Sequence, residues 1–169
     1  MSTVAFVALG SNLAHPRRQI AHAMAALARL PRTRVVALSP NYATAPLACD
    51  VDQPDYVNAV VALRTSLSPR ALLLHLQAIE RAQGRERGAA RLRNAPRTLD
   101  LDLLLFGRRR VRLPQLTLPH PRMHERAFVL IPLLDIAPAV TIPGRGPAQA
   151  LRHAVRGQRI ARTRSHSLH

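Results

Sequence analysis

Two aspartates, Asp100 and Asp102, stand two positions apart inside an apolar run that continues to Phe106. Such a run predicts a strand, and side chains two residues apart on a strand point to the same face. The two carboxylates would then lie close together, where like charges repel unless a cation lies between them. A divalent metal ion meets that need, and Arg97 adds a group for an anionic substrate. The same pattern also fits two solvated aspartates on the wet face of a strand.

The elements that must position this pair follow from local patterns. Ser68 and Pro69 form a typical helix start, and Gly84 is placed to end that helix after Gln83. The order of strands and helices predicts an α+β fold, a two-layer sandwich in which helices cover one face of a mainly antiparallel sheet. The strands are expected over 3–9, 34–38, 56–63 and the aspartate segment, and the helices over 16–30, 68–83, 127–136 and 147–155.

The length of 169 residues and the hydrophobic content of 47% fit a single folded domain. We expect this domain to span residues 1–156, followed by a basic, disordered tail over 157–169. Charges or prolines interrupt every apolar run, so no membrane span is expected. The first residues look like a strand rather than a signal peptide, and Cys49 is the only cysteine. These features favour a cytoplasmic protein.

The formal net charge of +16 points to an anionic partner. A small basic module that binds RNA or DNA is one interpretation. Every basic residue is arginine, however, so a coding bias is an equally simple cause. The aromatic content is only 3%, which leaves few platforms for stacking bases. We therefore expect no specific nucleic-acid partner.

Five segments, in the same order along the chain, resemble the 6-hydroxymethyl-7,8-dihydropterin pyrophosphokinase family: 8–13, 52–59, 96–107, 116–120 and 126–128. The resemblance implies a ferredoxin-like α+β fold and a place in folate biosynthesis. It implies transfer of a pyrophosphoryl group from ATP to the hydroxymethyl oxygen of the dihydropterin, with release of AMP. It further implies two Mg²⁺ ions bridging the aspartates and the ATP phosphates, and a monomeric enzyme whose partners are ATP and the pterin.

The resemblance also implies roles for single residues. Asp100 and Asp102 would be the metal ligands and, with Arg85 and Arg97, the catalytic residues. The ATP site would be lined by Leu73, Gln77, Glu80, Arg85, Arg87, Arg97, Leu103, Thr117, His120 and Arg126. The pterin site would be formed by Thr44, Ala45, Pro46, Leu47, Tyr56, Asn58 and Phe128.

Several of these residues have simpler interpretations when taken alone. Phe128 would be expected in the core, His120 in a turn between prolines, and Gln77 and Glu80 on the wet face of a helix. A metal-dependent nuclease or nucleotidyltransferase would use the same aspartate pair. That alternative gives no role to Tyr56, Asn58 and Phe128.

Overall fold

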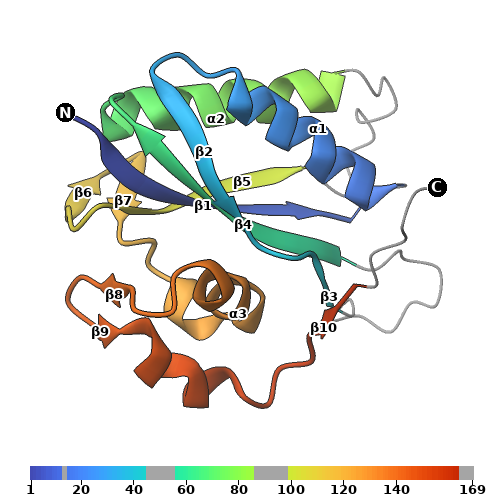
Figure 1. The fold of residues 1–169 in the computed structure, drawn as a ribbon, viewed down its shortest axis with the longest axis vertical. Helices are drawn as coiled ribbons and strands as arrows, with labels where there is room; N and C mark the ends of the chain where they lie inside the picture. Colours follow the sequence, from blue (N-terminus) through green and yellow to red (C-terminus); the bar gives the residue numbers. More distant parts are fainter. Residues whose placement is uncertain (13–14, 45–55, 86–98, 164–169) are drawn as a thin grey trace.

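The computed structural model describes residues 1–12, 15–44, 56–85 and 99–163 (Figure 1). At its centre lies a sheet of strand order β10-β3-β4-β1-β5, in which β2 also pairs with β4, and all of these pairs are antiparallel. Two small hairpins, β6-β7 and β8-β9, stand apart from this sheet. The strands are β1 (Thr3–Ser11), β2 (Thr33–Leu38), β3 (Tyr42–Thr44), β4 (Tyr56–Thr65), β5 (Asp100–Phe106), β6 (Val111–Leu113), β7 (Leu116–Leu118), β8 (Thr141–Ile142), β9 (Gly146–Pro147) and β10 (Ala161–Arg162).

The helices begin where the sequence predicts. In α2, the Ser68 side-chain oxygen accepts a hydrogen bond from the Ala71 amide at 3.1 Å, and Pro69 opens the first turn. The expected end is wrong by two residues, because α2 continues through Gly84 to Arg85. The helices are α1 (Pro16–Ala28), α2 (Pro69–Arg85) and α3 (Ala127–Ile136), with the 3₁₀ helices η1 (Met123–Glu125) and η2 (Ala148–Val155).

The core has two parts, one on each face of the sheet. Alternate residues of β1 divide between them: Val7 and Leu9 pack with α1 and α2, whereas Phe6 packs with α3. The fold class is α+β, as predicted. The expectation that helices cover only one face is wrong, because α3 and η2 cover the face opposite α1 and α2 (Figure 1).

The C-terminal segment departs from the predicted tail. Residue 157 was expected to open a disordered stretch, but β10 pairs with β3, with Ala161 opposite Ala43 and Arg162 opposite Tyr42. The ordered part of the chain therefore reaches at least Thr163, and β10 forms one edge of the central sheet. Within the described ranges, no helix is long and apolar enough to cross a membrane.

Candidate active site

Five residues in register form a row across five strands of the central sheet. Arg162 of β10 lies opposite Tyr42 of β3, Tyr42 opposite Asn58 of β4, Asn58 opposite Gly10 of β1, and Gly10 opposite Asp100 of β5. Residues directly opposite one another on neighbouring strands point to the same face. This row therefore brings the predicted pterin residue Asn58 and the predicted metal ligand Asp100 onto one face.

The two aspartates lie together on the face that α3 also covers. Leu101 and Leu103, which alternate with them along β5, are buried against α1 and α2 on the other face. Asp100 and Asp102 are only half-buried, so their carboxylates lie at the border between core and solvent. The prediction that both share one face is thus confirmed by the burial pattern of β5.

Tyr56 joins the predicted pterin residues to the aspartates. Its hydroxyl donates a hydrogen bond to Asp100 Oδ2 at 2.7 Å, and the ring reaches β5 by crossing over Gly10 of β1. A Cβ atom on Gly10 would lie 2.6 Å from Tyr56 Cε1 and 3.0 Å from Asn58 Oδ1. Glycine at this position therefore makes room for the Tyr56 ring.

Asn58 is 3% exposed, so its amide is held inside the sheet face. Its Nδ2 donates to Thr44 Oγ1 at 3.4 Å, and the Thr44 hydroxyl donates to the Tyr56 carbonyl oxygen, also at 3.4 Å. Both contacts are long, so they restrain the polar groups weakly and leave them able to bond a ligand.

Glu80 of α2 fixes the strand that carries the aspartates. One carboxylate oxygen of Glu80 accepts a hydrogen bond from the Leu101 amide at 2.9 Å, between the two aspartates in sequence. Because β5 is an edge strand of the sheet, this amide points away from its β1 partner and needs another acceptor. Glu80 supplies that acceptor and thereby ties β5 to α2.

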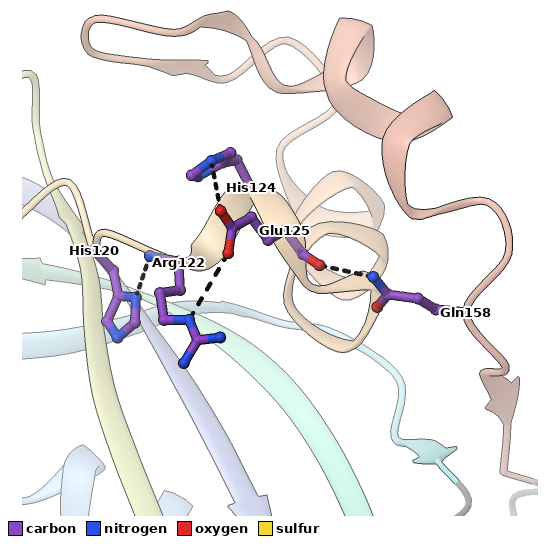
Figure 2. A network of polar contacts seen from close by, with 5 residues as sticks. All are labelled: His120, Arg122, His124, Glu125 and Gln158. Carbon is purple, nitrogen blue, oxygen red and sulfur yellow. Dashed lines mark hydrogen bonds and ion pairs between the residues drawn. The ribbon is translucent and has the colours of Figure 1, made fainter. Parts of the chain in front are cut away.

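His120 lies near Asp102, after the β7 strand. Its amide donates to the Leu104 carbonyl oxygen at 2.9 Å, and its Nδ1 accepts from the Arg122 amide at 3.2 Å (Figure 2). Burial lowers the pKa of His120 below 6.5; Asp102 partly opposes that shift, while Arg126 and Arg122 add to it. The imidazole is therefore neutral at pH 7, with its proton on Nε2.

Arg126 and Phe128 meet at the start of α3. The Arg126 guanidinium carbon lies 5.5 Å from the centre of the Phe128 ring, a cation–π distance. The aromatic ring is half-buried rather than enclosed in the core. The structure thus places a predicted ATP residue against a predicted pterin residue.

The remaining predicted residues fall into two groups. Leu103 is 4% exposed and Leu73 packs against the core, whereas Gln77 is half-buried on α2 and Thr117 is exposed on β7. Any contact from Leu103 to a ligand would therefore come from its backbone. The residues outside the described part of the chain are Ala45, Pro46, Leu47, Arg87 and Arg97, together with the side chain of Arg85.

The aspartate pair fits a magnesium site completed by substrate. Among the described residues there is no cluster of three or more His, Cys, Asp or Glu side chains that could hold a metal alone. Magnesium commonly binds through one or two carboxylates, with substrate phosphates and water as the other ligands. Two adjacent, half-buried carboxylates on one sheet face supply that donor set.

Two residues that position the site were missed by sequence reasoning. Gly10 was predicted to lie just beyond the strand over 3–9, within the 8–13 segment that resembles the family, and no signal within the sequence shows which side chain crosses it. Gln158 was placed in the tail, but its side chain contacts the residues on either side of Arg126. The contacts of both residues depend on pairing between segments that lie far apart in the sequence.

Comparison with known protein families identifies one match over most of the chain. The family described as 7,8-dihydro-6-hydroxymethylpterin-pyrophosphokinase (HPPK) matches residues 6–138. Three bacterial proteins named 2-amino-4-hydroxy-6-hydroxymethyldihydropteridine pyrophosphokinase are similar in sequence. The Pseudomonas aeruginosa protein is 56% identical, covering 82% of this chain and 83% of its own length. The Haemophilus influenzae protein is 47% identical, covering 82% of this chain and 84% of its own length. The Bacillus subtilis protein is 41% identical, covering 83% of this chain and 81% of its own length.

Solved structures agree with the fold. A crystal structure of Plasmodium falciparum HPPK-DHPS with pteroate superposes with a TM-score of 0.68 at 13% sequence identity. The superposition covers 90% of this chain but 42% of the longer Plasmodium chain. A second crystal structure of the wild-type Plasmodium falciparum HPPK-DHPS gives a TM-score of 0.68 at 14% identity, covering 90% of this chain and 44% of that one.

Proposed function

Since the chain belongs to the 7,8-dihydro-6-hydroxymethylpterin-pyrophosphokinase family, it transfers pyrophosphate from ATP to hydroxymethyldihydropterin in folate biosynthesis, and we propose which of its residues perform that transfer. The reaction joins the hydroxymethyl oxygen of the pterin to the β-phosphorus of ATP. The bond between the α- and β-phosphates breaks, and AMP leaves.

The observation that carries the assignment of the site is the cross-strand row from Asn58 to Asp100. The row has a buried amide and a half-buried carboxylate on one face, and the Tyr56 hydroxyl donates a 2.7 Å hydrogen bond to that carboxylate. A heterocycle seated at Asn58 would therefore lie next to phosphates seated at the aspartates. This adjacency is what a transfer between two bound substrates requires.

Asp100 and Asp102 would hold two Mg²⁺ ions together with ATP. When bound, the magnesium ions neutralise charge on the phosphates that react and leave. Glu80 keeps the carboxylates in place by holding the Leu101 amide between them. His120 presents a neutral imidazole whose Nε2 proton can be donated to a phosphate oxygen.

The phosphates would also meet arginine side chains. Arg126 lies at the start of α3 beside Phe128, and we assign Arg85, Arg87 and Arg97 to the same anion by resemblance to the family. The guanidinium fork matches phosphate oxygens in geometry and keeps its charge at every physiological pH. Arg85 and Arg97 would thus stabilise charge that moves towards the leaving AMP.

The pterin would lie between the rings of Tyr56 and Phe128. Flat heterocycles bind in slots with aromatic faces and a few polar groups at the edge. Asn58 offers one donor and one acceptor in its amide, which suits the amide and amino edge of a pterin. Thr44 and the segment 45–47 would complete that edge. The wider ATP lining would include Leu73, Gln77, Leu103 and Thr117.

One chain supplies both the carboxylates and the pterin residues, which supports a monomeric enzyme. Its use of ATP supports a cytoplasmic location. Sedimentation of the purified protein would test the monomeric state, and cell fractionation would test the cytoplasmic location.

The experiment that tests the metal assignment replaces each aspartate without changing its size. In Asp100→Asn and Asp102→Asn, turnover should fall by roughly 100-fold or more, because the amide cannot ligate Mg²⁺ as a carboxylate does. Binding of MgATP, measured by titration calorimetry, should weaken in the same variants. Glu125→Gln is the control, since this carboxylate is exposed and its ion pairs within the described ranges are with Arg122 at 3.8 Å and His124 at 3.6 Å. Near-normal turnover in either aspartate variant would show that the metal assignment is wrong.

A further inference from the structure

The segment from Gln158 to Thr163 contacts two of the elements that carry proposed pterin residues, α3 and β3. It lies beyond the part of the chain that the family model matches, which ends at residue 138. One contact reaches the start of α3, and the other reaches β3. We call this segment, represented by Gln158 and β10, the C-terminal brace.

Gln158 holds the first turn of α3 through both ends of its side chain. Its Nε2 donates to the Glu125 carbonyl oxygen at 2.7 Å (Figure 2). Its Oε1 accepts from the Ala127 amide at 2.8 Å. The first amides of a helix have no acceptor within the helix, and the Arg126 side chain does not cap α3. Gln158 thus fixes the backbone on both sides of Arg126 and directly before Phe128.

Strand β10 holds the short strand β3 from its open side. The Thr163 amide donates to the Asn41 carbonyl oxygen at 2.9 Å, in line with the pairing of Arg162 opposite Tyr42. Without β10, the three residues of β3 would pair only with β4, as the edge of the sheet (Figure 1). A three-residue edge strand has few hydrogen bonds to keep it ordered.

Tyr42, the β3 residue that pairs with Arg162 of the brace, also joins β3 to α3. The Tyr42 hydroxyl donates to Asp135 Oδ2 of α3, while Tyr42 lies opposite Asn58 on the other side. Tyr42 is thus held between β10, α3 and β4. Thr44 lies two residues further along β3, on the same face of the sheet.

We propose that Gln158 and β10 are positioning groups for the pterin: Gln158 sets Phe128 through the start of α3, and β10 sets Thr44 through β3. The inference rests on the proposed pterin roles of Thr44, Asn58 and Phe128. Its physical basis is preorganisation, because a site ordered before binding does not spend binding free energy on ordering itself.

Two pairs of variants test the brace in the full-length protein. Gln158→Leu keeps the approximate size but loses both hydrogen bonds, and Gln149→Leu is a matched change at an exposed glutamine of η2. Thr163→Pro removes both the amide and the hydroxyl that donate to the Asn41 carbonyl oxygen, whereas Thr163→Ala keeps the 2.9 Å amide bond and loses only the longer 3.3 Å hydroxyl bond. The measurements are KM for each substrate, kcat, and the melting temperature.

We expect KM for the pterin to rise about fivefold to tenfold in Thr163→Pro, the change that one lost backbone hydrogen bond typically produces, and by at least as much in Gln158→Leu, which loses two hydrogen bonds. In Thr163→Pro, kcat and KM for ATP should stay within about twofold, because β3 carries no proposed ATP residue. Gln158→Glu, which retains an acceptor for the Ala127 amide but loses the donor to the Glu125 carbonyl oxygen, should recover only part of the pterin affinity. The two control variants should match the wild type.

A wild-type KM for the pterin in both Gln158→Leu and Thr163→Pro would overturn the proposal. Equal losses in kcat and in both KM values, together with a lower melting temperature, would overturn it too, since they indicate general destabilisation. Phe128→Leu separates this inference from the site on which it rests. If Phe128→Leu leaves KM for the pterin unchanged, the pterin assignment itself is wrong.

Discussion

Gly10→Ala should reduce catalysis sharply although it adds a single methyl group. The new Cβ would lie 2.6 Å from Tyr56 Cε1, whereas ordinary contacts of this kind begin at 3.4 Å. The Tyr56 ring would therefore have to move by about 0.8 Å, and its hydroxyl would leave the 2.7 Å hydrogen bond to Asp100. The added atom also lies 3.0 Å from Asn58 Oδ1, so the amide that we propose to bind the pterin would be displaced as well.

The expected loss follows from the size of this displacement. A shift of about 1 Å in a positioning group reduces turnover by up to about 100-fold. We therefore expect kcat/KM for the pterin to fall by about 30-fold to 100-fold. The affinity for MgATP should change by a smaller factor. The assay is AMP formation at varied pterin concentration, with MgATP binding measured by calorimetry.

Gly157→Ala is the matched control for this prediction. Its added Cβ would meet no heavy atom within 4 Å, so activity should be unchanged. If Gly10→Ala retained wild-type kcat/KM for the pterin, the close approach of Tyr56 over β1 would not matter to function. The proposed link between the pterin side and the aspartates would then be refuted.

Two further predictions concern the groups around the site. Glu80→Leu should leave the partly buried Leu101 amide without the Glu80 carboxylate as its acceptor. The free energy of unfolding, measured by urea denaturation, should then fall by about 1–3 kcal/mol. An unchanged denaturation midpoint would contradict the role of Glu80. Burial, together with Asp135, raises the pKa of Tyr42 above 10.0. Because the folded state favours the protonated phenol, the contribution of Tyr42 to stability is complete below pH 10. That contribution is lost as the pH rises through the pKa that Tyr42 has in the folded protein. The stability advantage of the wild type over Tyr42→Phe should thus shrink above pH 10, and a constant difference would contradict this.

Local patterns predicted much of the fold because they depend on neighbours in the sequence. Period-two burial along β5 placed Asp100 and Asp102 on one face, and the Ser68–Pro69 start of α2 follows from capping. The site residues Tyr56, Asn58 and Phe128 came from resemblance to a family. Composition and spacing alone favoured the core for Phe128.

What sequence reasoning missed depends on contacts between distant segments. Helix α3 is apolar almost all round, so its pattern does not show which sheet face it covers. Residues 161–162 show no strand pattern, and they become β10 only because the edge of β3 offers hydrogen bonds. The role of Gly10 likewise appears only when strand register places Asn58 opposite it and the Tyr56 ring crosses over it.

The measurement that tests the central claim most directly is the identity of the nucleotide product. Purified protein is mixed with MgATP and 6-hydroxymethyl-7,8-dihydropterin, and nucleotides and pterins are separated and quantified over time. Transfer of a pyrophosphoryl group predicts one AMP for each pterin diphosphate formed, with no reaction when Mg²⁺ is withheld. Formation of ADP, or no turnover with both substrates and Mg²⁺ present, would contradict the account.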